Sequence, residues 1–285
     1  MSTTDPMHLS ENELRGMTAD LDAMHHDLTL PALETSLAEW AEDIRTQTAD
    51  EDDDPARLAF LDRRRFLTRM GGAAGGVAGA ALLAACGSSS TSSVKVSNGN
   101  PASGPASAAA MSGGEGQNLS GDLQVVAMAA SLENSGIATY TAGIKAATAG
   151  KLGTVPPAVV TFARTAMKQH EDHQKAWNAV LTAAGKQPVT AVDPVIQPTI
   201  NTAFAKVDNV TGLAELALLV ENIAGETYLN GLSVIKSAAG IKTAASIEPV
   251  EFQHAAILSF ILGKYPVPDA FTGVSSARPP SDYHV

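Results

Sequence analysis

Three glutamates and three histidines fall on positions where a buried helical face normally carries apolar residues. Glu133, for example, lies within a stripe from Leu123 to Ile144 that advances in alternating steps of three and four. Carboxylates and imidazoles are metal ligands, and buried carboxylates are costly without a cation. Because no lysine or arginine lies on these stripes, the pattern favours a bound metal over a structural polar cluster. The candidate ligands are Glu133, His170, His173, Glu221, Glu251 and His254.

Four helices must position these side chains. Aromatic residues make up only 5% of the chain, which favours closely packed helices over a β-sandwich, and we predict an all-α fold. Asp122 is expected to cap the first helix, and Pro249 marks either a kink or a late start in the fourth. The helices are predicted over 122–149, 157–184, 212–238 and 243–262, with a short additional helix near 198–206.

An internal repeat relates the two halves of this bundle. The segment from Leu132 to Gly143 aligns with the segment from Val220 to Gly231, and both place a tyrosine seven residues after the glutamate. The alignment that we prefer equates His170 with Glu251 and His173 with His254, since it keeps the large apolar positions in register. A competing alignment pairs Gln169-His170 with Gln253-His254. The tyrosines, Tyr140 and Tyr228, are expected to pack in the core, with electron relay as the alternative.

These residues resemble the ferritin-like superfamily, and specifically its exported bacterial ferritin-like domain proteins, over most of residues 121–270. The resemblance implies a four-helix bundle with a di-iron or di-manganese site, built from two single glutamates and two Glu-x-x-His pairs. Glu133 and Glu221 match the single glutamates, and Glu251-Phe252-Gln253-His254 matches one pair. His170-Glu171-Asp172-His173 departs from the pattern, because a histidine replaces the glutamate. The extra imidazole is expected to weaken the second metal position and to shift the preference toward zinc, copper or a single iron over manganese. Iron or manganese is the expected cofactor, with a di-metal site possible and zinc still open. Glu171 and Glu226 are weaker candidates.

Charge is distributed unevenly along the 285-residue chain. The formal net charge is −11, and residues 1–62 alone hold 16 acidic and 3 basic residues. The remainder is close to neutral and has no basic patch, which argues against nucleic-acid binding. The single cysteine, Cys86, excludes an intramolecular disulfide and any multi-cysteine metal site.

A second resemblance concerns residues 63–86. Arg63 and Arg64, followed by Phe66 and Leu67, resemble a twin-arginine export signal. The apolar run that follows, residues 70–85, is shorter than the roughly 20 residues of a typical membrane-spanning helix and ends in a lipobox-like Leu-Ala-Ala-Cys. The resemblance implies lipidation of Cys86 and export by the twin-arginine machinery. It also implies anchoring at the extracytoplasmic face of the cytoplasmic membrane, in the cell envelope.

The chain therefore divides into four predicted parts. Residues 1–62 form an acidic leader in which 9–24 and 31–47 could be short amphipathic helices. We interpret this leader as dispensable or as the product of a misassigned start, with a regulatory or chaperone-binding extension as the alternative. The other parts are the export signal at 63–86, a flexible Ser/Gly/Ala-rich linker at 87–120, and the ferritin-like domain at 121–285.

Two functions fit this organisation. The first is a lipid-anchored metalloprotein, with one or two metal ions in the bundle core, that reacts with oxygen or peroxide. The second is a non-catalytic envelope lipoprotein that acts as a structural or binding module. A homodimer is compatible with both, whereas a storage cage is not expected of a membrane-tethered chain.

Overall fold

The computed structural model describes residues 9–50, 119–267, 272–279 and 281. The export signal and Cys86 lie outside these ranges. No strand occurs within them, so the all-α prediction is confirmed. No helix in the same ranges has the length and apolar character needed to span a bilayer. The elements are α1 (Glu11–Met24), the π-helix η1 (His25–Thr29), α2 (Leu30–Asp50), α4 (Asp122–Thr148), α5 (Pro157–Ala183), α6 (Gln197–Phe204), α7 (Val210–Gly231) and α8 (Ala238–Ile261).

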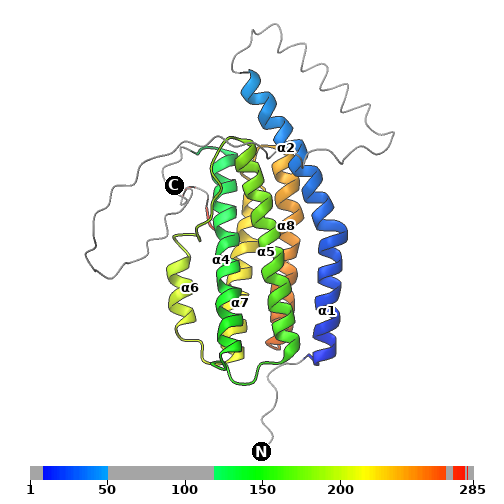
Figure 1. Ribbon diagram of the computed structural model, residues 1–285, viewed down its shortest axis with the longest axis vertical. Helices are drawn as coiled ribbons and strands as arrows, with labels where there is room; N and C mark the ends of the chain where they lie inside the picture. The colour runs from blue at the N-terminus through cyan, green and yellow to red at the C-terminus, as the bar shows by residue number, and fades with distance from the viewer. Residues whose placement is uncertain (1–8, 51–118, 268–271, 280, 282–285) are drawn as a thin grey trace, which may run out of the picture. The chain divides into compact units, whose positions relative to one another are not determined.

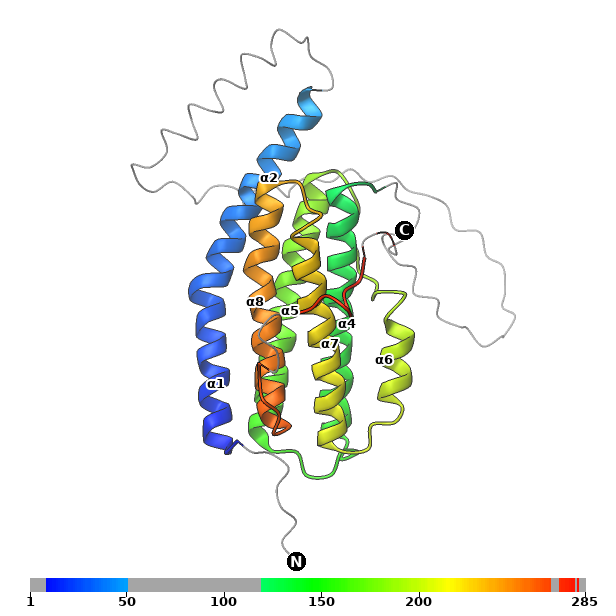
Figure 2. The ribbon, with the colours of Figure 1, turned by 180° about the vertical axis from the view of Figure 1, so that it is seen from behind.

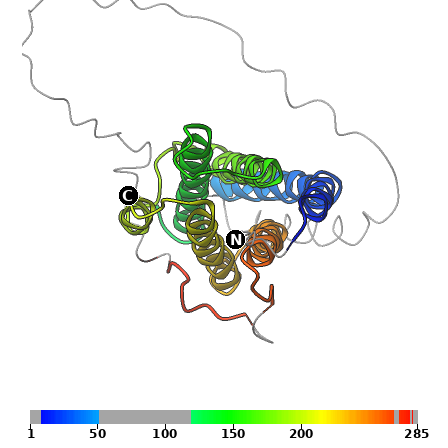
Figure 3. The same cartoon turned by 90° about the horizontal axis from the view of Figure 1, so that it is seen from below.

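Helices α4, α5, α7 and α8 form a four-helix bundle (Figures 1 and 2). Short turns join α4 to α5 and α7 to α8, so each pair is antiparallel. A long connection containing α6 returns the chain from the end of α5 to the opposite end of the bundle, and α5 and α7 therefore run in the same direction. Seen along its axis, the bundle has α6 outside α4 and α7, and α1 outside α5 and α8 (Figure 3).

The turn between α7 and α8 differs from the prediction. Helix α7 ends at Gly231 and α8 begins at Ala238, so α8 continues through Pro249 and does not start late. Asp122 does not occupy the cap position of α4, where Gly121 stands with a φ of 57°. Its carboxylate instead accepts hydrogen bonds from the backbone N–H groups of Lys236 and Ser237, at 3.0 and 2.8 Å. These bonds stabilise the turn that precedes α8 and explain the earlier start of this helix.

Two apolar clusters fill the bundle, one toward each end. One cluster contains Val126, Trp177 and Ile247, and the other contains Phe162 and Leu258. On each of the four helices the candidate ligands lie between the residues of one cluster and those of the other. The polar side chains are therefore enclosed by apolar layers on both sides, which excludes water and raises the cost of any unpaired charge.

The N-terminal helices belong to the same compact unit as the bundle. Leu14 and Leu21 of α1 join one apolar cluster, and Leu33 and Trp40 of α2 join the other. The Trp40 ring approaches Gly240 of α8 so closely that a Cβ there would lie 2.7 Å from it. The predicted amphipathic helices are thus present. Their apolar faces help to cover the core, which does not fit the interpretation of this segment as a dispensable leader.

Candidate metal centre

The six predicted ligands converge at mid-height in the bundle, and every one of their side chains is buried. Glu133 comes from α4, His170 and His173 from α5, Glu221 from α7, and Glu251 and His254 from α8. Their ligand atoms form two groups, each of which could hold a metal ion. The first group is Glu133, His170, His173 and Glu251, and the second is His170, Glu221, Glu251 and His254.

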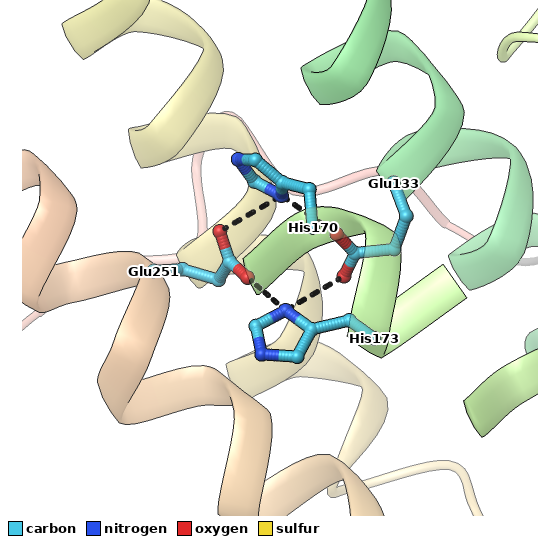
Figure 4. A group of neighbouring side chains, drawn as sticks. All are labelled: Glu133, His170, His173 and Glu251. Carbon is cyan, nitrogen blue, oxygen red and sulfur yellow. Dashed lines mark hydrogen bonds and ion pairs between the residues drawn. The ribbon is translucent and has the colours of Figure 1, made fainter. Parts of the chain in front are cut away.

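The first group joins α4, α5 and α8 (Figure 4). Nδ1 of His173 lies 2.9 Å from Oε1 of Glu251 and 3.6 Å from Oε1 of Glu133. Nδ1 of His170 lies 2.7 Å from Oε2 of Glu133 and 3.7 Å from Oε2 of Glu251. The four side chains therefore point toward one another and present two imidazole nitrogens and two carboxylates to a common centre.

The second group joins α5, α7 and α8 and repeats this arrangement. Nδ1 of His254 lies 3.3 Å from Oε2 of Glu221 and 3.7 Å from Oε2 of Glu251. Nε2 of His170 lies 3.3 Å from Oε1 of Glu221. His170 and Glu251 are shared by the two groups, whereas His173 and His254 each belong to one. This correspondence agrees with the alignment that equated His170 with Glu251 and His173 with His254.

Two tyrosines connect the halves of the repeat. The hydroxyl of Tyr140 on α4 donates to Glu221 on α7, and the hydroxyl of Tyr228 on α7 donates to Glu133 on α4. Nε1–H of Trp177 donates to the Tyr228 oxygen at 2.6 Å. The tyrosines are buried, as expected for packing residues. Sequence reasoning missed that each tyrosine donates to the glutamate of the other repeat. The equal spacing from glutamate to tyrosine in the two repeats was the available signal.

The comparison with known families agrees with this geometry. Residues 121–264 match the ferritin-like domain family. The chain belongs to the ferritin-like domain family. No curated protein and no solved structure matches the chain significantly. The matched range contains the four bundle helices and all six candidate ligands, and it excludes α1, η1 and α2.

In the absence of a bound cation, the neighbouring carboxylates raise the pKa values of the three buried histidines. Burial alone would lower the pKa of His173, but the charges of and hydrogen bonds with Glu133 and Glu251 outweigh it and raise the pKa from 6.5 to about 9. The same balance raises the pKa values of His170, where Glu251 and Glu221 dominate, and of His254, where Glu221 dominates. The raised pKa values favour the protonated histidines, whose positive charges offset negative charge in the polar layer.

The glutamates and tyrosines respond in the opposite sense. Burial alone would raise the pKa of Glu133, but the neighbouring His173 and His170 lower it to about 2, and His254 and His170 likewise lower that of Glu221. Burial, together with the facing carboxylates, raises the pKa values of both tyrosines. Tyr140 and Tyr228 therefore stay neutral and act as donors to ionised glutamates.

The donor set fits a metal ion at Glu251. Both carboxylate oxygens of this fully buried residue lack a hydrogen-bond partner among the residues that the structure describes, although Nδ1 of His173 lies close to one of them. Buried carboxylate oxygens are normally hydrogen-bonded, and an orphaned pair is costly. Glu251 is also the carboxylate that the two groups share, which is where an ion would satisfy both oxygens.

Four further residues complete the description. Glu171 belongs to neither group, and neither does Glu226, whose carboxylate accepts from the backbone N–H of Ser276 at 2.6 Å. Sequence reasoning missed Gln169, whose Oε1 accepts from Nε2–H of His254 at 2.7 Å, and also His25 of η1 beside His173. Gln169 directly precedes His170 in the sequence, so it was within reach of the helical pattern. His25 lies in the segment that the sequence analysis interprets as a leader.

Gly136 provides the space that His170 requires. A Cβ at Gly136 would lie 3.0 Å from three atoms of the His170 ring, whose nitrogens are held by Glu133 and Glu221. In the repeat the equivalent position is Ala224. The repeat in which His170 replaces a glutamate therefore has a glycine on the facing helix, where the other repeat has an alanine.

We predict that Gly136→Ala destabilises the metal-free protein by about 1–3 kcal/mol through overpacking against His170. Alanine has a higher helix propensity than glycine, so propensity alone would make the substitution stabilising. A loss of stability therefore indicates the clash with His170. Gly16→Ala is the matched control, because Gly16 is exposed in α1 and has no atom within 4 Å of its Cβ position. It should stabilise the protein by about 0.5–1 kcal/mol. Chemical denaturation measures both, and a stabilising Gly136→Ala would contradict the prediction.

Proposed function

We propose that the protein binds one or two metal ions in the core of its ferritin-like bundle, iron or manganese in preference to zinc. The observation that carries this proposal is the pair of four-residue groups that share His170 and Glu251. Both oxygens of Glu251 face histidines but lack a hydrogen bond within the described residues. Three carboxylates and three imidazoles, all buried, form a donor set suited to first-row transition metals.

His170 makes the two positions unequal. A carboxylate at this place could bridge two ions through its two oxygens, as Glu251 can, but a neutral imidazole offers one lone pair. One group therefore holds an ion more weakly than the other. This asymmetry supports a mononuclear or a strongly unequal dinuclear centre, and the high imidazole content keeps zinc as the competing ion.

The surroundings support reaction with a small oxidant. Bound iron or manganese would supply one-electron chemistry toward oxygen or peroxide. The chain's own residues orient the site: Tyr140 and Tyr228 hold Glu221 and Glu133, and the apolar layers exclude water. A cavity of about 40 Å³ is lined by Tyr140 and Phe162, whose rings also contact His170 and His254. A space of this size suits a diatomic or triatomic molecule, since one water occupies about 30 Å³ of the liquid.

A non-catalytic scaffold remains the second candidate function. The observation that favours it is the match between three histidines with raised pKa values and three glutamates, which allows the polar layer to be neutral without a metal. In this form the protein would be a ferritin-like module whose surface carries its role. Metal content separates the two candidates.

We predict that the full chain, purified after growth with iron, manganese and zinc available, contains one or two of these ions per chain. His254→Ala should lose at least one of them, because it removes a buried donor of the second group. His26→Ala is the control for adventitious binding, since His26 is exposed and lies outside both groups. Elemental analysis and circular dichroism decide: a folded, metal-free wild type would contradict the metal function and leave the scaffold.

We also predict that metal binding and protons compete. Since an ion displaces the protons of His173 and its neighbours, metal affinity should rise with pH up to about 9, with protons released on binding. The metal-free protein should behave oppositely. The raised pKa of His173 contributes stability below about 6.5, and this contribution is lost as pH rises through about 9. Calorimetric titration in buffers of different ionisation enthalpy counts the protons, and pH-independent affinity would contradict the prediction.

The location of the protein is proposed from its sequence. Arg63, Arg64, Phe66 and Leu67 support export by the twin-arginine machinery, and Cys86 supports lipid anchoring at the extracytoplasmic membrane face. Several acyl chains would hold the protein stably, whereas one would be marginal.

We predict that Cys86→Ser abolishes incorporation of labelled fatty acid and releases the protein from the membrane fraction. Replacing Arg63 and Arg64 by lysines should retain it in the cytoplasm, because the paired arginines are what the export machinery reads. Fractionation with immunodetection measures both effects. A wild-type chain that takes up no fatty acid would contradict the anchoring proposal and leave the metal proposal untouched.

A further inference from the structure

His25 is buried against the metal centre from outside the bundle. It lies in η1, is 2% exposed, and neither of its ring nitrogens has a hydrogen-bond partner among the described residues. Its ring centroid lies 5.3 Å from that of His173, with 59° between the planes. A fully buried imidazole with two unsatisfied nitrogens is expensive, so its contact with a candidate ligand calls for a functional reason.

His254 shows what surrounds a ligand histidine in this bundle. Its Nδ1 faces the carboxylates of the second group, and its outward Nε2–H donates to Oε1 of Gln169 at 2.7 Å. Gln169 in turn donates from Nε2 to the backbone oxygen of Leu21 in α1, at 3.5 Å. Metal-ligating histidines nearly always use their second nitrogen in this way, because the outer hydrogen bond fixes the tautomer and the ring orientation.

His173 has the same inward geometry without an outer partner of this kind. Its Nδ1 faces Glu133 and Glu251, and its Nε2 points away from them (Figure 4). That outer nitrogen is buried and unpartnered within the described residues. The repeat equates His173 with His254, so an acceptor is expected here too, and the ring packed against His173 outside the cluster is that of His25.

We propose that, when metal is bound, His25 accepts a hydrogen bond from Nε2–H of His173 and thereby positions this imidazole to bind the ion through Nδ1. The proposal rests on the metal function proposed above. His25 acts through His173 and is a positioning residue, not a ligand. Leu21 of α1 already accepts a hydrogen bond from Gln169, the partner of His254. The N-terminal segment would then orient the outer nitrogens of both His173 and His254, the histidines that belong to one group each.

The tautomer of His25 follows from its other neighbour. Nε2 of His25 lies 3.8 Å from Oδ2 of Asp172, whose carboxylate is held by Lys168 and Lys175. In the neutral tautomer that carries its proton on Nε2, toward Asp172, the lone pair on Nδ1 is available to His173.

The π-helix accounts for the presence of a histidine at this point. Leu14, Thr18, Leu21 and His25 follow one another on the buried face of α1 and η1. The wider turn of η1 shifts the register, so that Leu33 and Trp40 of α2 again face the bundle. Single π-helical turns within α-helices often occur at functional sites, because they re-aim side chains without ending the helix.

The test measures Co²⁺ binding by the full chain, with affinity from calorimetry and the coordination environment from the visible absorption bands. His25→Phe keeps a ring but removes the acceptor, and His25→Gln keeps an acceptor in Oε1. His26→Phe is the control on the adjacent, exposed histidine. We expect His25→Phe to weaken Co²⁺ binding about 10- to 100-fold and to alter the absorption bands. His25→Gln should restore most of the affinity, and His26→Phe should leave both readouts unchanged.

Each outcome decides the proposal. If His25→Phe binds Co²⁺ with wild-type affinity and an unchanged spectrum, the positioning role is overturned while the metal function stands. If the wild type binds neither Co²⁺ nor iron nor manganese, both fall. Circular dichroism and unfolding of the metal-free variants show whether the substitution disturbs the fold. If His25→Phe does not fold, the comparison of His25→Leu with His25→Gln carries the same test, and equal affinities of these two would overturn the proposal.

Discussion

The structure depends on compensating three carboxylates that are removed from water in one layer of a helical bundle. Each needs an opposite charge or a donor, and the chain provides both from within the layer: three histidines, and two tyrosines that donate to the glutamates. The same donor atoms are those that a metal ion would use. These contacts offset the buried charges in the absence of a metal ion, but within the described residues they leave both oxygens of Glu251 without a hydrogen bond.

The duplicated architecture follows from this requirement. Each half supplies a glutamate and a tyrosine on one helix and a pair of ligands on the next. Each glutamate contacts a histidine of its own half and also accepts from the tyrosine of the other half. Tyr140 reaches Glu221 and Tyr228 reaches Glu133, so the halves complete one another only when they pack together. Burial of the polar layer therefore couples formation of the site to association of the two helix pairs.

One substitution breaks the symmetry and gives the protein its individual character. His170 occupies the place of the second shared carboxylate, and Gly136 makes room for its ring. The two candidate groups have the same composition, two glutamates and two histidines, but the one lone pair of a neutral His170 can serve only one of them. The N-terminal helices add a second asymmetry, since they reach one terminal histidine through Gln169 and lie against the other through His25.

The sequence by itself determined the all-α fold, the bundle helices apart from the turn between α7 and α8, and the six buried polar side chains, because helical periodicity is a local property of the spacing of residue types. It also determined the repeat and the departure at His170. Only the tertiary structure decided what depends on contacts between distant segments. Examples are the hydrogen bonds by which Tyr140 and Tyr228 each donate to the glutamate of the other repeat, and the bond from the start of α8 to Asp122. The packing of α1 and α2 on the bundle is another. Most acidic residues of α1 and α2 lie on exposed faces, whereas the packing of these helices depends on a few buried residues, such as His25, that composition does not reveal.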